Sequence, residues 1–144
     1  MSDLSLDQAR TIVSRALAHG RELKLKPLSV IMLDSRGALK AAESEDGVSL
    51  KRAEIAHGKA YGALALGMGS RALDKRAQDQ AYFMSAVSHV VGGSMVPVPG
   101  GVLVRDEAGR LLGAVGISGD LSDNDEAAAV AGIEAAGLRA DTGA

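Results

Sequence analysis

The stretch MVPVPGGVLVRDEAGRLLGAVGISGDLSDNDE, residues 95–126, predicts a Pro/Gly connector, two hairpin strands and the start of a helix. Pro97 and Pro99 have no amide donor and a restricted backbone, so the segment around them should be an edge or a connector. Strands are expected at residues 102–105 and 110–118, because these apolar runs flank the short Gly-containing link DEAG. The pattern therefore predicts an antiparallel strand pair followed by a helix.

One face of the second strand is expected to receive a close neighbour. The residues of this face become smaller along the strand: Leu112, Ala114, Gly116 and Ser118. A helix or a ligand can approach closely where side chains are small or missing. The sequence thus predicts that a helix or a ligand contacts the strand closely near its C-terminal end, at Gly116 and Ser118.

The N-terminal half predicts a helix, a hairpin and a second helix. Ser5 and Gln8 have the spacing of a capping box, and an amphipathic helix should follow over residues 6–24. Two strands, 28–33 and 38–44, flank the turn sequence DSRG, and a helix is expected over 50–66. Its internal glycines, at positions 58 and 62, should allow a sheet or a second subunit to pack closely.

Serines are expected to cap three of the helices. These are Ser49 for the helix at 50–66, Ser70 for a helix at 71–80, and Ser122 for the last helix, which should stop near Gly137. Residues 82–91 fit either a helical turn or an extended segment, and 94–96 fit a short strand. The last residues, 139–144, are expected to form a tail beyond a core of about 4–138.

Composition excludes several classes of protein. The chain has 144 residues, 47% of them apolar and 24% charged, which predicts one ordinary globular domain over residues 1–144. With no cysteine, the chain has no disulfide, no thiolate metal site and no covalent haem attachment. A net charge of −2 with three aromatic residues argues against nucleic acid. The first residues lack a signal-peptide pattern and no stretch suits a membrane, so a cytoplasmic protein is expected.

The runs PVPGGVLVRD, GAVGISGD and DNDEA resemble the GlcG/HbpS-like family, often labelled haem-degrading or haem-binding. The resemblance continues through DSRG (34–37), EDG (45–47) and RAEIAHGKA (52–60), and it covers roughly residues 4–138. It implies a single-domain α/β (α+β) fold, profilin-like, with a central antiparallel sheet of about five strands flanked by helices. It also implies homo-oligomers. Ser44 and Glu45 stand where many family members have Arg and Met, so this chain lacks one cation of the family's pocket.

His57 is the candidate ligand for haem iron or another metal. His57 and Tyr61 are four residues apart and therefore share one face of the helix at 50–66, where Tyr61 can be a hydrogen-bond partner or an alternative ligand. The alternative interpretation is a partly exposed polar stripe, or a histidine satisfied at a subunit interface. His89 is a second candidate for the axial position.

Arg52 and Lys59 are candidate cations for carboxylates, either haem propionates or a small organic acid. They lie on the same helix, near the loop that contains Pro99, Gly100 and Gly101, whose backbone amides can add neutral donors. The alternative interpretation for Lys59 is a solvated helix face. These residues, with His57 and Tyr61, define a predicted pocket between the helix at 50–66 and the Pro97–Gly101 loop.

Two functions of different class follow. The resemblance implies a small oligomeric protein that binds haem or another small ligand and has an accessory or sensory role. The alternative is an isomerase or lyase acting on a small organic acid in a catabolic pathway. In that case Arg52 or Lys59 would hold a carboxylate, and His57 or Glu43 would transfer a proton. A third interpretation is a structural oligomer without an active pocket.

Overall fold

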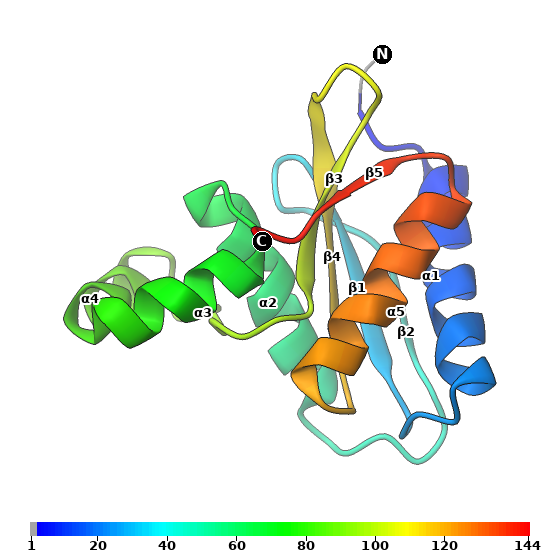
Figure 1. The fold of residues 1–144 in the computed structure, drawn as a ribbon, viewed down its shortest axis with the longest axis horizontal. Coiled ribbons are helices and arrows are strands. Elements are labelled where there is room, and N and C mark those ends of the chain that lie inside the picture. Colours follow the sequence, from blue (N-terminus) through cyan, green and yellow to red (C-terminus); the bar gives the residue numbers. More distant parts are fainter. Residues whose placement is uncertain (1–2) are drawn as a thin grey trace.

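The computed structural model describes residues 3–144, which form five helices and one five-stranded antiparallel sheet (Figure 1). The helices are α1 (Leu6–Glu22), α2 (Arg52–Leu66), α3 (Ser70–Asp79), α4 (Ala81–Val90) and α5 (Ser122–Ala135). The strands are β1 (Ser29–Asp34), β2 (Leu39–Ser44), β3 (Gly101–Arg105), β4 (Leu111–Ser118) and β5 (Arg139–Asp141). Their order across the sheet is β2-β1-β4-β3-β5. The predicted mixed α/β fold is confirmed.

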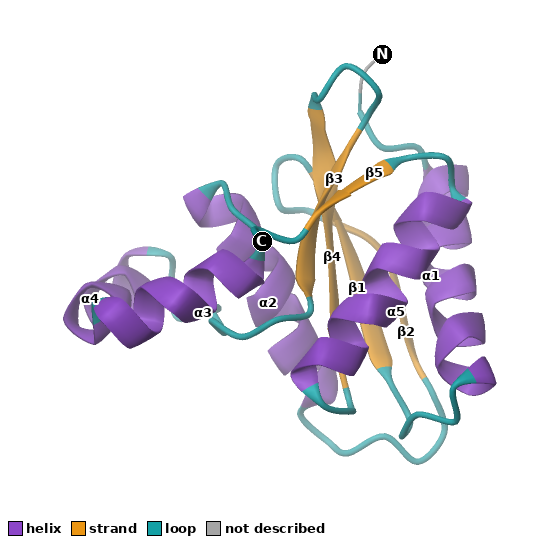
Figure 2. Cartoon of the chain, viewed as in Figure 1, coloured by secondary structure: helices purple, strands orange, loops and turns teal. Residues whose placement is uncertain are grey.

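The sheet is covered on both faces (Figure 2). Every residue of β1 is buried, because alternate side chains enter two different cores. Val30 and Met32 join the core formed with α1 and α5, whereas Ile31 and Leu33 join the core under α2. In Figure 1, α3 and α4 extend away from the sheet on the side of α2.

The predicted start of α1 is confirmed, because Ser5 and Gln8 form both hydrogen bonds of a capping box. The predicted strand pair of the opening stretch is also confirmed, as β3 and β4. Gly116 on the small face of β4 is approached by a helix. A Cβ there would overlap the carbonyl oxygen of Ala56 in α2.

The three predicted serine caps are wrong. The residues at the capping positions of α2, α3 and α5 are Lys51, Gly69 and Leu121, and none makes a side-chain cap. Two of the serines have other partners: Ser49 Oγ accepts from Arg52 Nε and Ser70 Oγ accepts from the Gly101 amide. Ser122 is itself the first residue of α5.

Three further segments differ from expectation. The ambiguous run at 82–91 is helical, as α4. The expected strand at 94–96 is an irregular connection, because its Val96 amide donates to the carbonyl of Gly58 in α2 and not to a strand. The expected tail contains β5, which pairs with β3 at the sheet edge and is held by an Arg105–Asp141 ion pair of 3.0 Å.

The turn between β1 and β2 depends on the Asp34 carboxylate. Its Oδ1 atom accepts from the amides of Arg36 (2.9 Å) and Ala38 (3.0 Å), and the residue is buried. Burial alone raises the pKa of Asp34, but these hydrogen bonds outweigh it and hold the pKa below the ordinary value of 3.8.

Asp34→Ala should lower the free energy of unfolding by about 1–3 kcal/mol near neutral pH, because two amides lose their acceptor. A depressed pKa stabilises the fold above the unfolded value and loses this effect as the pH falls through the folded value. Urea unfolding at about pH 7 and about pH 3 should therefore show a smaller difference at the lower pH. The exposed Asp79→Ala is the control, and an equal difference at both pH values would contradict the assignment.

Candidate functional site

His57 is held in one orientation on α2. Its Nδ1 atom lies 2.7 Å from Ser94 Oγ, and its ring stacks on Tyr61 with centroids 5.3 Å apart and planes 16° from parallel. The shared face expected from the four-residue spacing is therefore present. Within residues 3–144, no side chain or carbonyl hydrogen-bonds Nε2 of this ring. A hydrogen bond on one imidazole nitrogen that leaves the other free is the arrangement seen in metal-ligating histidines.

A shallow groove of about 420 Å³ lies between α2 and the connection from α4 to β3, and Ser94, the hydrogen-bond partner of His57, is one of its lining residues. It is lined by Lys51, Glu54, Ile55, Gly58, Gly93, Ser94, Met95 and Val96. Gly58 and Gly62 make the close approach possible, since a Cβ at either position would meet Val96 or Met95. The expected close packing on these glycines is thus made by residues 95–96, and the groove borders 93–96 rather than 97–101.

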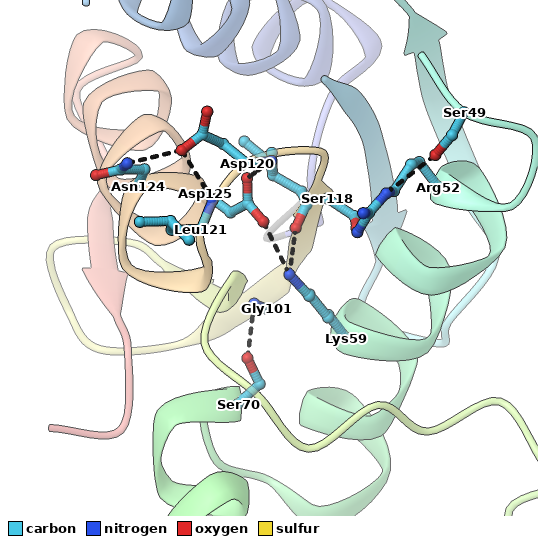
Figure 3. Close-up of polar contacts among 11 residues, drawn as sticks. Ser49, Arg52, Lys59, Ser70, Gly101, Ser118, Asp120, Leu121, Asn124 and Asp125 are labelled. Carbon is cyan, nitrogen blue, oxygen red and sulfur yellow. Dashed lines mark hydrogen bonds and ion pairs between the residues drawn. The ribbon is translucent and has the colours of Figure 1, made fainter. Parts of the chain in front are cut away.

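Lys59 points into the interior and not toward the groove. Its Nζ atom lies 3.1 Å from Asp125 Oδ2 and donates to the carbonyl of Ile117 at 2.9 Å (Figure 3). Both side chains are almost fully buried, at 3% and 1% exposure. Burial lowers the pKa of Lys59 and raises that of Asp125, while the charge of each partner opposes these shifts. The Lys59 ammonium therefore already has a carboxylate partner in α5.

The two loop glycines make room for this lysine. A Cβ at Gly100 would meet the Lys59 side chain, and one at Gly101 would overlap the Lys59 carbonyl. The Gly101 amide, expected to be a free donor, is bound by Ser70 Oγ at 2.7 Å. The sequence predicted Ser70 as a helix cap and residue 94 as part of a strand, but not their contacts with Gly101 and His57, because each partner is more than 30 positions away.

The remaining predicted residues lie in different places. Arg52 donates to the hydroxyls of Ser49 and Ser118 (Figure 3). It also lines a cavity at the start of α2. Pro99 is buried in a separate cavity beside Arg71. His89 is exposed near the end of α4, and Glu43 lines a fourth cavity beside Arg21. The structure thus brings His57 and Tyr61 together and separates them from Arg52 and Lys59.

Neither a cluster of metal-binding side chains nor a membrane-spanning helix is present among residues 3–144. No three His, Asp or Glu side chains of residues 3–144 are grouped as a metal site would require. Among the same residues, no helix has the length and apolar character needed to cross a membrane.

The fold resembles several solved structures. One is the crystal structure of the PduOC:Heme complex, with a TM-score of 0.84 and 25% identity over 99% of each chain. Another is protein ORFY of Klebsiella pneumoniae, with a TM-score of 0.85 and 18% identity over 95% of this chain and 92% of that one. A third is a double mutant of HbpS from Streptomyces reticuli, with a TM-score of 0.78 and 23% identity over 93% and 87%.

These likenesses define the class of the protein: a single-domain, profilin-like α/β fold built on one antiparallel sheet. No curated protein matches the sequence significantly. The family model described as haem degrading protein HbpS-like matches residues 4–134. The chain therefore belongs to the HbpS-like family.

Proposed function

We propose that this protein binds haem non-covalently, as a small oligomeric protein with an accessory or sensory role, and that His57 is the iron ligand. Membership of the HbpS-like family supports haem as the ligand, as does the 25% identity to the protein in the PduOC:Heme complex. The observation that carries the choice of residue is the imidazole held by Ser94 and Tyr61, with no hydrogen bond to Nε2 from residues 3–144, where Ser94 also lines a groove.

The groove that Ser94 lines suits a flat apolar group. Ile55, Met95 and Val96 supply apolar surface in the groove, and Gly58 keeps its floor flat. Haem iron is held in many proteins by a single histidine. When bound, haem would supply an iron centre for this ligand. The Ser94 hydrogen bond would fix the ring orientation, and stacking on Tyr61 would limit its rotation.

The oligomeric part of the proposal draws on α4. This helix is the most apolar of the five, yet Tyr82 and Val90 are 74% and 78% exposed on it. Exposed apolar surface is typical of protein contact sites, and α4 has one large exposed apolar side chain near each end. Such a surface supports self-association of this chain.

A haemin titration followed by absorbance tests the proposal. The wild type should show a saturable, stoichiometric change in the Soret band. His57→Ala should weaken binding by at least about tenfold, because the iron loses its nitrogen ligand. His89→Ala is the matched control, since it removes an exposed histidine from another cavity and should leave the titration unchanged.

Three outcomes would contradict parts of this proposal. Unsaturable haemin binding would exclude a specific haem site. Saturable binding that His57→Ala leaves intact and His89→Ala removes would move the iron ligand to α4. A monomeric mass by size exclusion with light scattering, with and without haemin, would contradict the oligomer.

A further inference from the structure

A second cavity, away from His57, lies where three connections meet at one end of the sheet. It has a volume of about 210 Å³ and is lined by Lys26, Pro27, Gly47, Val48, Ser49, Arg52 and Gly119. These residues come from the α1–β1, β2–α2 and β4–α5 connections and from the first residue of α2. It shares no lining residue with the groove that Ser94 lines.

The lining of this cavity contains two cations and no acid. The Arg52 guanidinium donates to two neutral oxygens, Ser49 Oγ and Ser118 Oγ, each at 3.2 Å. Neither Arg52 nor Lys26 belongs to an ion pair with any residue of the described chain, 3–144. A half-buried guanidinium without a carboxylate has unused capacity for one.

By contrast, the three other cavities that contain a cation each have that cation in an ion pair with an acidic side chain. Arg21 pairs with Glu45 at 2.9 Å, Lys51 with Glu54 at 2.8 Å, and Arg71 with Glu126 at 3.0 Å. Their charges are largely cancelled within the chain, so an incoming anion gains little from them. Among these four cavities, the one at Arg52 has cations that form no ion pair with any of residues 3–144.

Asp120, an acid next to the lining residue Gly119, is already engaged by the protein. Asp120 Oδ2 accepts from the Lys26 amide at 2.8 Å, and Oδ1 accepts from the Leu121 amide and the Asn124 side chain. The hydrogen bond from Asn124, with those of the two amides, lowers the pKa of Asp120. This carboxylate therefore stays ionised and serves to hold the loops that form the cavity.

We propose that this cavity binds the carboxylate of a small organic acid, with Arg52 as the principal donor and Lys26 as a second cation. A planar guanidinium matches a carboxylate in a two-point contact. Pro27 and Val48 offer apolar surface to a short carbon chain. The carboxylate can come from a free acid or from a haem propionate, and the experiment separates the two.

The test is a titration with malonate followed by amide shifts in NMR spectra of the ¹⁵N-labelled protein. Saturable shifts should appear at Ser49, Arg52 and Gly119. Arg52→Gln should weaken binding by at least about tenfold, and Arg52→Lys by less, because a point charge replaces the two-point contact. Arg139→Gln, an exposed arginine on β5, is the matched control and should change nothing.

Further probes make the result decisive. Neutral malonamide should not bind, and the same thermal unfolding midpoint for Arg52→Gln and wild type would show that the variant folds. A repeat of the haemin titration with malonate present identifies the source: competition assigns the cavity to a propionate, and independence assigns it to a free acid. Either result supports the carboxylate site.

The proposal would be overturned by three results: no saturable shift with malonate, equal binding by Arg52→Gln, or tighter binding of inorganic phosphate than of malonate. None of these depends on His57, so the haemin titration alone still decides the proposed function.

Discussion

Lys59→Met is expected to lower the free energy of unfolding by about 3–5 kcal/mol, because it leaves a buried carboxylate without its cation. Asp125 is 1% exposed, and its Oδ2 atom has the Lys59 ammonium as its ion-pair partner. The variant also removes the donor to the Ile117 carbonyl at the end of β4. The contact joins α2, β4 and α5, so its loss should be felt by the whole domain.

Urea unfolding measures this effect as a shift in the midpoint with little change in slope. Lys51→Met is the control, because Lys51, the residue before α2, forms an exposed ion pair with Glu54 and its loss should change little. The double variant Lys59→Met with Asp125→Leu should recover about half of the loss, since no unpaired charge remains buried. A loss below about 1 kcal/mol for the single variant would show that the ion pair does not hold these elements together.

Gly116→Val should lower the free energy of unfolding by about 3 kcal/mol, because α2 and the sheet approach too closely for any side chain at this position. A Cβ at Gly116 would overlap the Ala56 carbonyl and lie 3.1 Å from the Ala60 Cβ. The obstacle is helix backbone, which cannot move aside as a flexible side chain can. The expected consequence is a shift of the whole helix or a loss of packing beneath it.

Thermal and urea unfolding together measure this second effect. Gly67→Ala is a suitable comparison, because Gly67 has a φ of +70° and no heavy atom within 4 Å of an added Cβ. Its cost should come from the left-handed backbone alone, about 1–2 kcal/mol. A smaller loss for Gly116→Val than for Gly67→Ala would contradict the close contact between α2 and β4.

The sequence predicted those parts of the fold whose signals are local. The capping box at Ser5 and Gln8 and the hairpin of β3 and β4 each depend on neighbours within a few positions, and both are present. The short strand β5 was missed, because Arg139–Asp141 has no local strand pattern and is ordered by pairing with β3. A serine before a helix is ambiguous for the same reason, as Ser70 shows by binding Gly101 instead.

The candidate site likewise has one part that the sequence predicted and another that it did not. Helical spacing was enough to place His57 beside Tyr61. It could not show that Ser94 would bind the imidazole, or that Lys59 would be buried against Asp125, 66 residues further along the chain. It also could not assign Arg52 to a cavity shared with Lys26 and Gly119.

By itself, the sequence determined the order of most helices and strands, the family resemblance and the shared face of His57 and Tyr61, because these follow from short-range periodicity and turn chemistry. Only the tertiary structure decided which cation is paired and which is free. A charge on a helix face has no partner until the fold brings one to it. Here the packing of α5 against β4 brings Asp125 to Lys59 and leaves Arg52 with two hydroxyl groups.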